Sequence, residues 1–395
     1  MSGNIQKIGV YPALGRSLAF YTLCHFLVDT MCYYYMFGSL LPALRYQNRA
    51  VLVIPALILY NLFAFGLQPL WGLVADRFPQ LPTGLLGMIL LVLGFVPRVL
   101  VPLRLPVWLL FIILMIVGIG NAAFHVEGGR DSLVRSGGNE LRTGVFAAGG
   151  AAGVMVGMAI APFGVALYIL LILWAVSLPT LIWLRYEAKR SLFFSEIPQF
   201  VQFPTLTMKR DAKQGVVMAS FFLLLQTMTL PTLSLLRGGP YQVHGEFWFS
   251  WIFPVGLALI LVGSRPLGGW LTSRVHVFPF LLGSWLLSLL PIIFQLYSPW
   301  LLLLSGFILA APSAWAAYRY YYLLPHRPAF AYSLQKIPMF IASFVVLSRQ
   351  AIYGVPSLIG SSLEIIISVV WLSLFIFGLV KHLKFYIYRR KVLHE

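Results

Sequence analysis

Charged residues are scarce in this sequence. Only 10% of its 395 residues are Asp, Glu, Lys or Arg, whereas soluble domains carry about a quarter. Acidic residues number 11, and there are two cysteines. Apolar residues make up 60% of the chain, and the mean hydropathy is +0.87. This composition excludes a soluble domain and predicts a polytopic membrane protein.

The motifs of several kinds of site are also missing. The sequence has no convincing phosphate-binding glycine loop, catalytic triad or metal-ligand spacing, so we expect neither an enzyme nor a bound metal or cofactor. Cys24 and Cys32 lie eight residues apart in one apolar run, which favours buried thiols over a disulfide. That run is long enough to be a permanent span and does not resemble a cleavable signal peptide.

Apolar segments of about 20 residues, the length of a membrane-spanning helix, recur along the whole chain. They are expected near residues 17–38, 51–74, 82–103, 106–127, 142–163, 165–184, 215–236, 248–270, 278–297, 300–322, 330–353 and 360–381. The expected fold class is therefore an all-α polytopic membrane protein with 12 transmembrane helices.

Basic residues are distributed unevenly between the two sides of the membrane. If the N-terminus is inside, 22 of the 28 Lys and Arg residues fall on the inner side, among them Arg265 and Lys336. This bias predicts a multi-pass protein of the inner (plasma) membrane with both termini in the cytoplasm. The net charge of +17 then reflects topology and contact with anionic membrane lipids, and it does not indicate nucleic-acid binding.

A basic hydrophilic connector at residues 185–214 divides the apolar segments into two groups. We expect an N-terminal six-helix bundle in residues 1–184 and a C-terminal six-helix bundle in residues 215–395. This is the layout of major facilitator transporters, whose halves are repeats around a central site. Residues 69–77 and 266–274 both run Pro-Leu, then Gly, then a basic residue, although Ser273 stands in the place of Asp76.

The first span carries two ionisable residues near mid-depth. His25 and Asp29 are four residues apart and therefore share one helix face. A carboxylate at this depth is rare unless it faces the bundle interior, where it marks an ion or proton path. We therefore expect proton coupling at this pair; the alternative is a structural pair that bonds to a neighbouring helix. Weak candidates for the wall of a substrate cavity are Tyr33, Tyr34 and, before a proline in the seventh span, Gln226.

A second group of ionisable residues lies at the inner end of the fourth span, in residues 118–131. With the residues that follow the second span, it predicts a charge network that gates the cytoplasmic face; its members are Asp76, Arg77, His125, Glu127 and Arg130. Asp76 would pair with Arg130 or with a helix dipole across a gap. The alternative is a turn with solvated charges.

Glycines mark places where helices approach one another closely. Gly72 is expected to allow such an approach after the second span. The fifth span holds a stripe of glycines spaced four apart, with one beside it: Gly149, Gly153 and Gly157, and Gly150. Small-residue stripes permit close helix packing in lipid. A glycine-rich fifth helix is also typical of exporters in this superfamily, and the two interpretations stay open.

These residues resemble the fosmidomycin-resistance family of major facilitator exporters. The match comprises Gly118-x-Gly120-x-Ala122-x-Phe124-His125-x-Glu127-x-x-Arg130, Ser136-Gly137-Gly138, Gly144, Phe146, Gly149-Gly150, His25 with Asp29, Gln68-Pro69-x-x-Gly72-x-x-x-Asp76-Arg77-x-Pro79 and, more weakly, Tyr322–Arg327. It is dense over residues 20–162. The chain departs from the family pattern at Val126, where the family has Pro, at Ala147 and Ala151, and at Tyr332-Ser333.

The resemblance implies proton-coupled efflux of a small toxic compound or drug by antiport and alternating access. The partners would be the small-molecule substrate and protons, and we expect a monomer. One alternative is a proton-coupled importer of a sugar or an organic acid on the same fold. The other is a non-transporting membrane sensor or scaffold, which the loss of an acid at Ser273 favours slightly.

Overall fold

The computed structural model describes residues 12–100, 105–136, 139–161, 247–273 and 310–353, with a few isolated helical positions between them. These residues form helices and short connections, and none of them is in a strand. The connector at residues 185–214, Gln226 and both termini lie outside the described residues.

The helices of residues 12–161 follow one another with short connections. They are α1 (Pro12–Tyr34), η1 (Tyr35–Leu40), α2 (Leu41–Tyr46), η2 (Ala50–Leu52), α3 (Val53–Asn61), η3 (Leu62–Gly66), α4 (Gln68–Arg77), α5 (Thr83–Leu100), α6 (Val107–Arg135) and α7 (Glu140–Ile160). Two of them, η1 and η3, are π-helical insertions inside longer helical stretches. Local sequence explains the start of α7, because Asn139 accepts a hydrogen bond from the Arg142 amide in the first turn.

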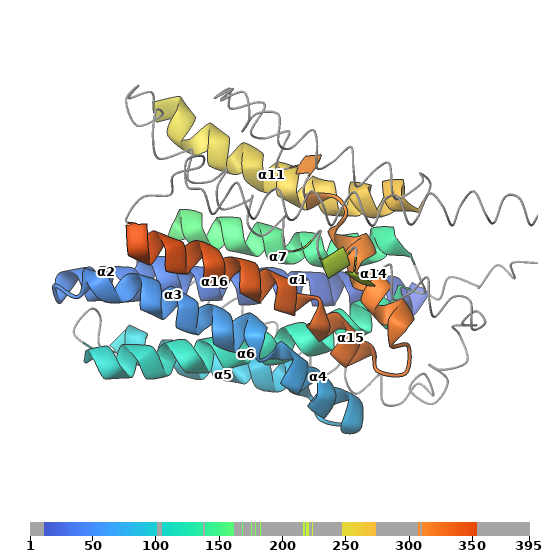
Figure 1. Ribbon diagram of the computed structural model, residues 1–395, viewed down its shortest axis with the longest axis horizontal. Coiled ribbons are helices and arrows are strands. Elements are labelled where there is room, and N and C mark those ends of the chain that lie inside the picture. The colour runs from blue at the N-terminus through green and yellow to red at the C-terminus, as the bar shows by residue number, and fades with distance from the viewer. Residues whose placement is uncertain are drawn as a thin grey trace, which may run out of the picture.

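The described helices of residues 247–353 form a second set. They are α11 (Phe247–Thr272), α14 (Ser313–Leu323), α15 (Pro328–Leu334) and α16 (Lys336–Tyr353). Most helices of both sets run along the long axis of the molecule (Figure 1). Within the described ranges, three stretches are long and apolar enough to cross a membrane: Ala50–Arg77, Val107–Val134 and Glu140–Ile160.

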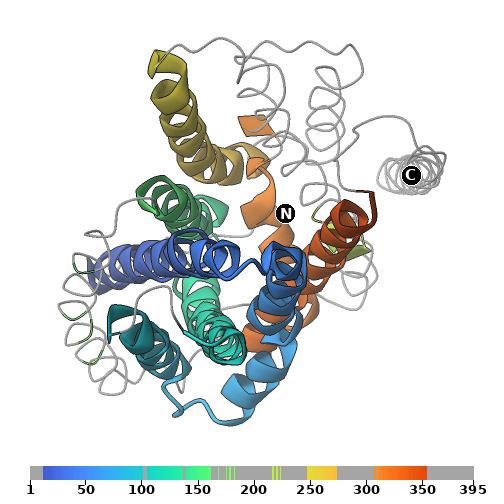
Figure 2. The same ribbon diagram turned by 90° about the vertical axis from the view of Figure 1, so that its left-hand side faces the viewer.

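The two sets of helices pack against each other along two seams. In one seam α7 lies between α1 and α11, and in the other α4 packs on α15 while α3 packs on α16. Figure 2 shows both seams end-on, with α16 beside α3. The core of the first set of helices contains large apolar side chains such as Tyr35, Phe95 and Phe124, each fully buried.

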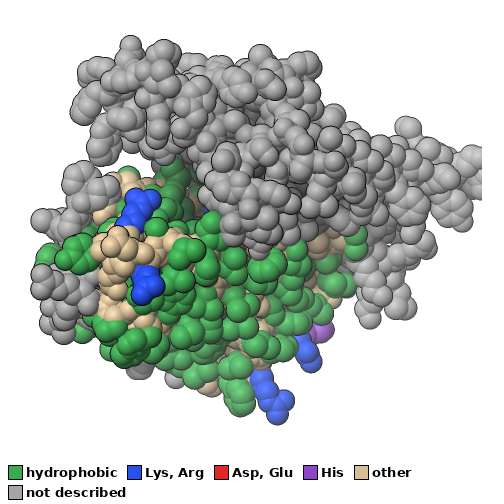
Figure 3. Space-filling view, turned by 60° about the vertical axis from the view of Figure 1, so that its left-hand side comes forward, with side chains coloured by type: hydrophobic (Ala, Val, Ile, Leu, Met, Phe, Trp, Pro, Cys, Tyr) green, Lys and Arg blue, Asp and Glu red, His purple; other side chains and the backbone are tan. Residues whose placement is uncertain are grey.

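The outer surface of the described helices is apolar, as expected for a protein that lies in lipid. Figure 3 shows one face covered by hydrophobic side chains, with only a few Lys and Arg side chains. Leu73, Leu93 and Trp108 are among the large apolar residues exposed on the molecule. In water such a surface would be costly, whereas lipid accommodates it.

One helix is longer than the sequence predicted. The fourth span was expected to end at residue 127, but α6 continues to Arg135. The polar run 118–131 is therefore buried helix and not the mouth of a loop. Because it stays helical, its side chains point in different directions and contact different neighbours.

Candidate functional site

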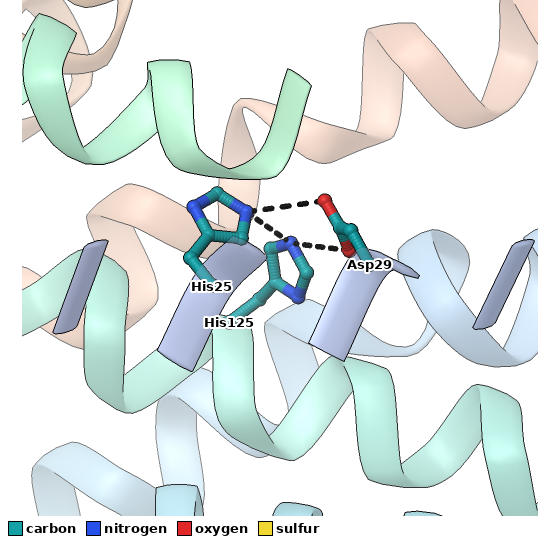
Figure 4. Close-up of side chains that lie close together, drawn as sticks. All are labelled: His25, Asp29 and His125. Atoms are coloured by element: carbon teal, nitrogen blue, oxygen red, sulfur yellow. Dashed lines mark hydrogen bonds and ion pairs between the residues drawn. The ribbon is translucent and has the colours of Figure 1, made fainter. Parts of the chain in front are cut away.

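Three ionisable side chains meet in the interior between α1 and α6. His25 Nε2 lies 3.3 Å from Asp29 Oδ2, and His125 Nε2 lies 3.5 Å from Asp29 Oδ1. The two Nε2 atoms are 2.8 Å apart (Figure 4). All three residues are buried. We call these residues the His–His–Asp cluster.

His125 is the member that the sequence did not assign to this site. It was predicted to belong to the gating network with Glu127 and Arg130, but the structure places it against His25 and Asp29. The reason is helical geometry, since five residues separate His125 from Arg130 and correspond to about 1.4 turns of α6. The one feature of the sequence that could have suggested this contact is that a histidine, His125, lies within the fourth predicted span and could face the His25–Asp29 pair of the first span.

The hydrogen bonds on the far sides of the imidazole rings determine where protons can lie. His25 Nδ1 is 2.8 Å from the Phe146 carbonyl oxygen, and His125 Nδ1 is 2.9 Å from the Asn121 carbonyl oxygen. A carbonyl oxygen only accepts, so both Nδ1 atoms must carry hydrogen. In neutral rings both Nε2 atoms would then present lone pairs to each other at 2.8 Å. A cation between them removes this repulsion.

The separation of the two nitrogen atoms favours a proton over a metal ion. The ligand atoms of the cluster all lie within 4.8 Å of one another, and three such groups could hold a metal. Two nitrogen ligands about 2.05 Å from a tetrahedral metal would be about 3.3 Å apart. The observed 2.8 Å is instead a normal N–H···N distance. One shared proton would make the pair cationic, and Asp29 would then supply the adjacent negative charge.

Asp29 is fixed by a further contact. Asn121 donates from Nδ2 to Asp29 Oδ1 at 3.1 Å, and α6 therefore contributes both Asn121 and His125 to the cluster. Other titratable side chains lie within electrostatic reach of Asp29; they are Cys32, Tyr33, Tyr60, Arg265, Tyr332 and Lys336. These residues come from α1, α3, α11, α15 and α16, so both sets of helices face the cluster.

The glycines of α7 create the space that the cluster occupies. A Cβ atom on Gly150 would lie 2.3 Å from His25 Nε2 and 2.7 Å from Asp29 Oδ2. On either side, Gly149 and Gly153 meet the α1 carbonyl oxygens of Thr22 and Phe26 at similarly short distances. Gly157 continues the stripe toward Tyr33. The stripe thus packs α7 directly on the helix that carries the two ionisable residues.

The two tyrosines named as cavity candidates differ in position. Tyr33 continues the face of His25 and Asp29 by another four residues and lies within electrostatic reach of Arg265. Tyr34 is 1% exposed and belongs to the hydrophobic core. Gln226, the third candidate, is outside the described residues.

Two basic residues lie deeper than the sequence predicted. Arg265 and Lys336 were expected near the cytoplasmic ends of their spans. In the structure Arg265 is inside α11 and donates from Nη1 to the Ala147 carbonyl oxygen of α7. Lys336 Nζ lies 5.3 Å from the centre of the Tyr332 ring. Counting residues from the ends of spans misplaced them because it cannot tell which helix face turns inward.

Asp76 joins α4 to the beginning of α15. Its Oδ1 accepts from the Ala329 amide at 3.0 Å, and its Oδ2 accepts from the Phe330 amide at 2.8 Å. These are the second and third residues of α15, a helix with no cap from its own side chains. Asp76 is therefore an N-cap supplied from more than 250 residues away. We call this the α4–α15 contact.

Gly72 belongs to the same contact. A Cβ atom there would lie 2.6 Å from Ser333 Oγ and 2.8 Å from Phe330 Cα, so α4 and α15 approach backbone to backbone. Of the two partners considered for Asp76, the structure has the helix dipole. Arg130 instead donates from Nε to Asp131 at 2.9 Å and remains within electrostatic reach of Asp76.

The other residues of the predicted charge network have separate roles. Glu127 accepts hydrogen bonds from the Gly84 amide at 2.9 Å and the Thr83 hydroxyl at 3.2 Å, both in the first turn of α5. Arg77 is exposed, and its guanidinium lies over the Phe78 ring at 5.9 Å. Arg77 follows Asp76 directly, and one residue rotates a helical side chain by about 100°, which turns it away from α15.

Further contacts between the two sets of helices lie near the start of α7, and the sequence did not indicate them. The Tyr318 hydroxyl of α14 bonds to the hydroxyls of Ser136 and Thr143. The Thr272 hydroxyl of α11 donates to Glu140. These contacts and the α4–α15 contact close this end of the described molecule. A tyrosine-rich segment such as 318–322 carries no signal for which of its rings will face another helix.

Comparison with known proteins supports the fold and leaves the family open. No protein-family model matches the sequence, and no curated protein matches it significantly. Solved structures do match over nearly the whole chain. The Escherichia coli fucose:proton symporter FucP is 14% identical, with a TM-score of 0.55 over 93% of this chain and 98% of that one. A bacterial homologue of the iron transporter ferroportin, in an outward-facing state, is 16% identical, with a TM-score of 0.59 over 92% and 98%.

A second structure of FucP, described as a major facilitator superfamily transporter in the outward conformation, has a TM-score of 0.52 at 14% identity and covers 91% of this chain and 97% of that one. The chain therefore has the all-α fold of major facilitator transporters, and three of its described stretches are long and apolar enough to cross a membrane. The matched structures named above are transporters.

Proposed function

We propose that this chain is a proton-coupled secondary transporter of a small molecule that works by alternating access. The observation that carries the proposal is the 2.8 Å contact between two imidazole Nε2 atoms whose Nδ1 atoms are both committed to carbonyl oxygens. This arrangement holds one proton more than two neutral histidines would, and Asp29 lies beside it. A buried ionisable group of this kind in a membrane protein marks a proton path.

The cluster is placed where its protonation can influence the conformation. His25 and Asp29 are on α1, His125 is on α6, and Arg265 of α11 faces the same carboxylate. Loss of the shared proton would leave two lone pairs in repulsion and would remove the positive charge in direct contact with Asp29. A ligand shifts a conformational equilibrium only by binding its two states unequally. We infer that the proton does so through these contacts.

We further propose the topology expected from the basic residues. Both termini would lie in the cytoplasm, and the halves 1–184 and 215–395 would be joined by the connector 185–214. The α4–α15 contact then falls on the cytoplasmic side. This contact, with the hydrogen bonds of the Asp76 carboxylate, would hold the cytoplasmic side closed while the opposite side is open. Its hydrogen bonds would break when the cytoplasmic side opens.

For the direction of transport there are two candidates. Efflux of a toxic compound in exchange for protons is supported by the resemblance to the fosmidomycin-resistance family over residues 20–162. Import of a small nutrient such as an organic acid together with protons is supported by two basic residues, Arg265 and Lys336, which suit an acidic substrate. Both lie within electrostatic reach of Asp29. A resistance and uptake screen in a host that lacks its own pumps identifies a transported compound and its direction.

The coupling is tested with that compound in reconstituted vesicles under an imposed pH gradient. We expect Asp29→Asn and His125→Gln to abolish gradient-driven flux. His326→Gln is the matched control, because His326 is exposed in the turn before α15 and should leave the flux unchanged. Full gradient-driven flux in Asp29→Asn would refute the proposal.

A further inference from the structure

The described residues near the His–His–Asp cluster carry more positive than negative charge, and the two basic residues among them, Arg265 and Lys336, are half-buried. Arg265 and Lys336 both lie within electrostatic reach of Asp29 and of each other. The other four described carboxylates are engaged elsewhere: Asp76 at α15, Glu127 at α5, Asp131 with Arg130, and Glu140 with Thr272. When the two histidines share a proton, Asp29 balances that charge. Two cations are then left without a described counter-charge.

A permanent excess of charge in a protein interior is unfavourable. Removing an ion from water costs several kcal/mol unless a partner compensates it. Arg265 cannot escape the cost by losing its proton, because a guanidinium stays charged in proteins. The Lys336 ammonium group lies over the Tyr332 ring, which compensates a cation only in part. Such a site is suited to a negative charge that arrives with a ligand.

The orientation of Arg265 shows which of its donors are available. Nη1 is occupied by the Ala147 carbonyl oxygen, which holds the guanidinium against α7. Nε is buried and has no hydrogen-bond partner among the described residues. Nε and Nη2 together form the side-on edge that binds a carboxylate through two parallel hydrogen bonds. This edge is the part of Arg265 left for a ligand.

We propose that the cargo is a small organic acid whose carboxylate binds between Arg265 and Lys336. Tyr33 and Tyr332, both within electrostatic reach of Arg265, lie beside the bound group. The site combines the planar guanidinium of Arg265 on α11 with the ammonium group of Lys336 on α16. Both lie within electrostatic reach of Asp29 on α1, which belongs to the other set of helices. The two basic residues thus come from one set of helices, whereas the His–His–Asp cluster comes from the other.

This proposal rests on the proton coupling proposed above and adds a direction to it. A proton on the cluster and an anion at Arg265 attract each other. Opposite unit charges roughly 10 Å apart in a protein interior raise each other's affinity by about tenfold. The cargo and the proton therefore bind together, which is the requirement for symport, whereas exchange requires that each displaces the other.

The test uses the full chain in detergent and three molecules of nearly the same shape. They are benzoate, which is anionic, benzamide, which is neutral, and benzylamine, which is cationic. We expect thermal stabilisation by benzoate with an affinity at least tenfold higher than for the other two. Arg265→Gln and Lys336→Gln should each weaken benzoate binding at least tenfold, and Arg265→Lys should weaken it less. Arg49→Gln is the control, since Arg49 is exposed.

A measurement without ligand guards against variants that fail to fold. Because Lys336 lacks a described counter-charge, Lys336→Met should raise the melting temperature of the protein in buffer without added anion. A lower melting temperature would show that the protein itself compensates the charge, and it would overturn the proposal. The absence of any preference for benzoate over benzamide and benzylamine would overturn it as well.

The failure of this proposal can be told apart from the failure of proton coupling. If benzoate binding depends on Arg265 but the flux of the transported compound does not respond to the pH gradient, the anion site is supported and proton coupling is refuted. If flux driven by the pH gradient requires Asp29 while the Arg265→Gln variant binds benzoate as the wild type does, proton coupling is supported and the anion site is refuted.

Discussion

The α4–α15 contact makes a quantitative prediction about conformational balance. In Asp76→Ala, the amides of Ala329 and Phe330 lose the only side-chain oxygens that the structure gives them as acceptors. Removing an N-cap costs about 0.5–2 kcal/mol, and the loss of a negative charge at a helix N-terminus adds about 0.3–1 kcal/mol. The closed arrangement of this end should therefore lose about 1–3 kcal/mol, a shift of roughly 5- to 150-fold toward the open one.

The measurement is the distance between spin labels on either side of the contact. Arg77 at the end of α4 and His326 in the turn before α15 are both exposed and can be replaced by labelled cysteines. The native Cys24 and Cys32 are buried and should react slowly with the label. Asp76→Ala should enlarge the population at long distance most. Asp76→Asn should enlarge it less, because its amide oxygen can still accept from one of the two backbone amides, whereas its NH2 group cannot accept from the other. An unchanged distance distribution in Asp76→Ala would show that Asp76 does not hold this end closed.

Two further predictions concern packing and the second set of contacts. Gly150→Ala should destabilise the protein by about 1–3 kcal/mol and reduce transport, because the new methyl group overlaps His25, whereas Gly263→Ala, with nothing within 4 Å, should be neutral or slightly stabilising in thermal unfolding. Equal melting temperatures for the two variants would contradict this. Tyr318→Phe removes the hydroxyl that joins α14 to α6 and α7, at a cost of about 1 kcal/mol. In the same spin-label measurement it should raise the ratio of the open to the closed population roughly fivefold. A variant indistinguishable from wild type would assign Tyr318 to packing alone.

Hydrophobic runs predicted the described spans well, because the bilayer sets their length. The expected spans 82–103 and 142–163 correspond to Thr83–Leu100 and Glu140–Ile160. The end of α6 was wrong by eight residues, since its last two turns carry polar side chains that are buried against protein. Hydropathy reports contact with lipid, and it is blind to polar helix that packs against other helices.

Within the site, spacing along one helix was informative and relations between helices were not. The pairing of His25 with Asp29 follows from four-residue spacing, and the structure has it. That His125 completes the cluster, and that Arg265 faces it, depends on how α6 and α11 are rotated about their axes. Nothing in the local pattern specifies that rotation, because it results from packing across the whole seam.

The capping of α15 by Asp76 has a consequence for the folding of that helix. α15 has only seven residues, no side-chain cap of its own, and a proline at its start. Helices this short are marginal without outside support. Its secondary structure is therefore conditional on the position of α4, and separation of the two helices would expose the amides of Ala329 and Phe330 to solvent. If the protein works by alternating access, part of the free energy of opening is the cost of unfolding the start of α15, and the two halves would not move as entirely rigid bodies.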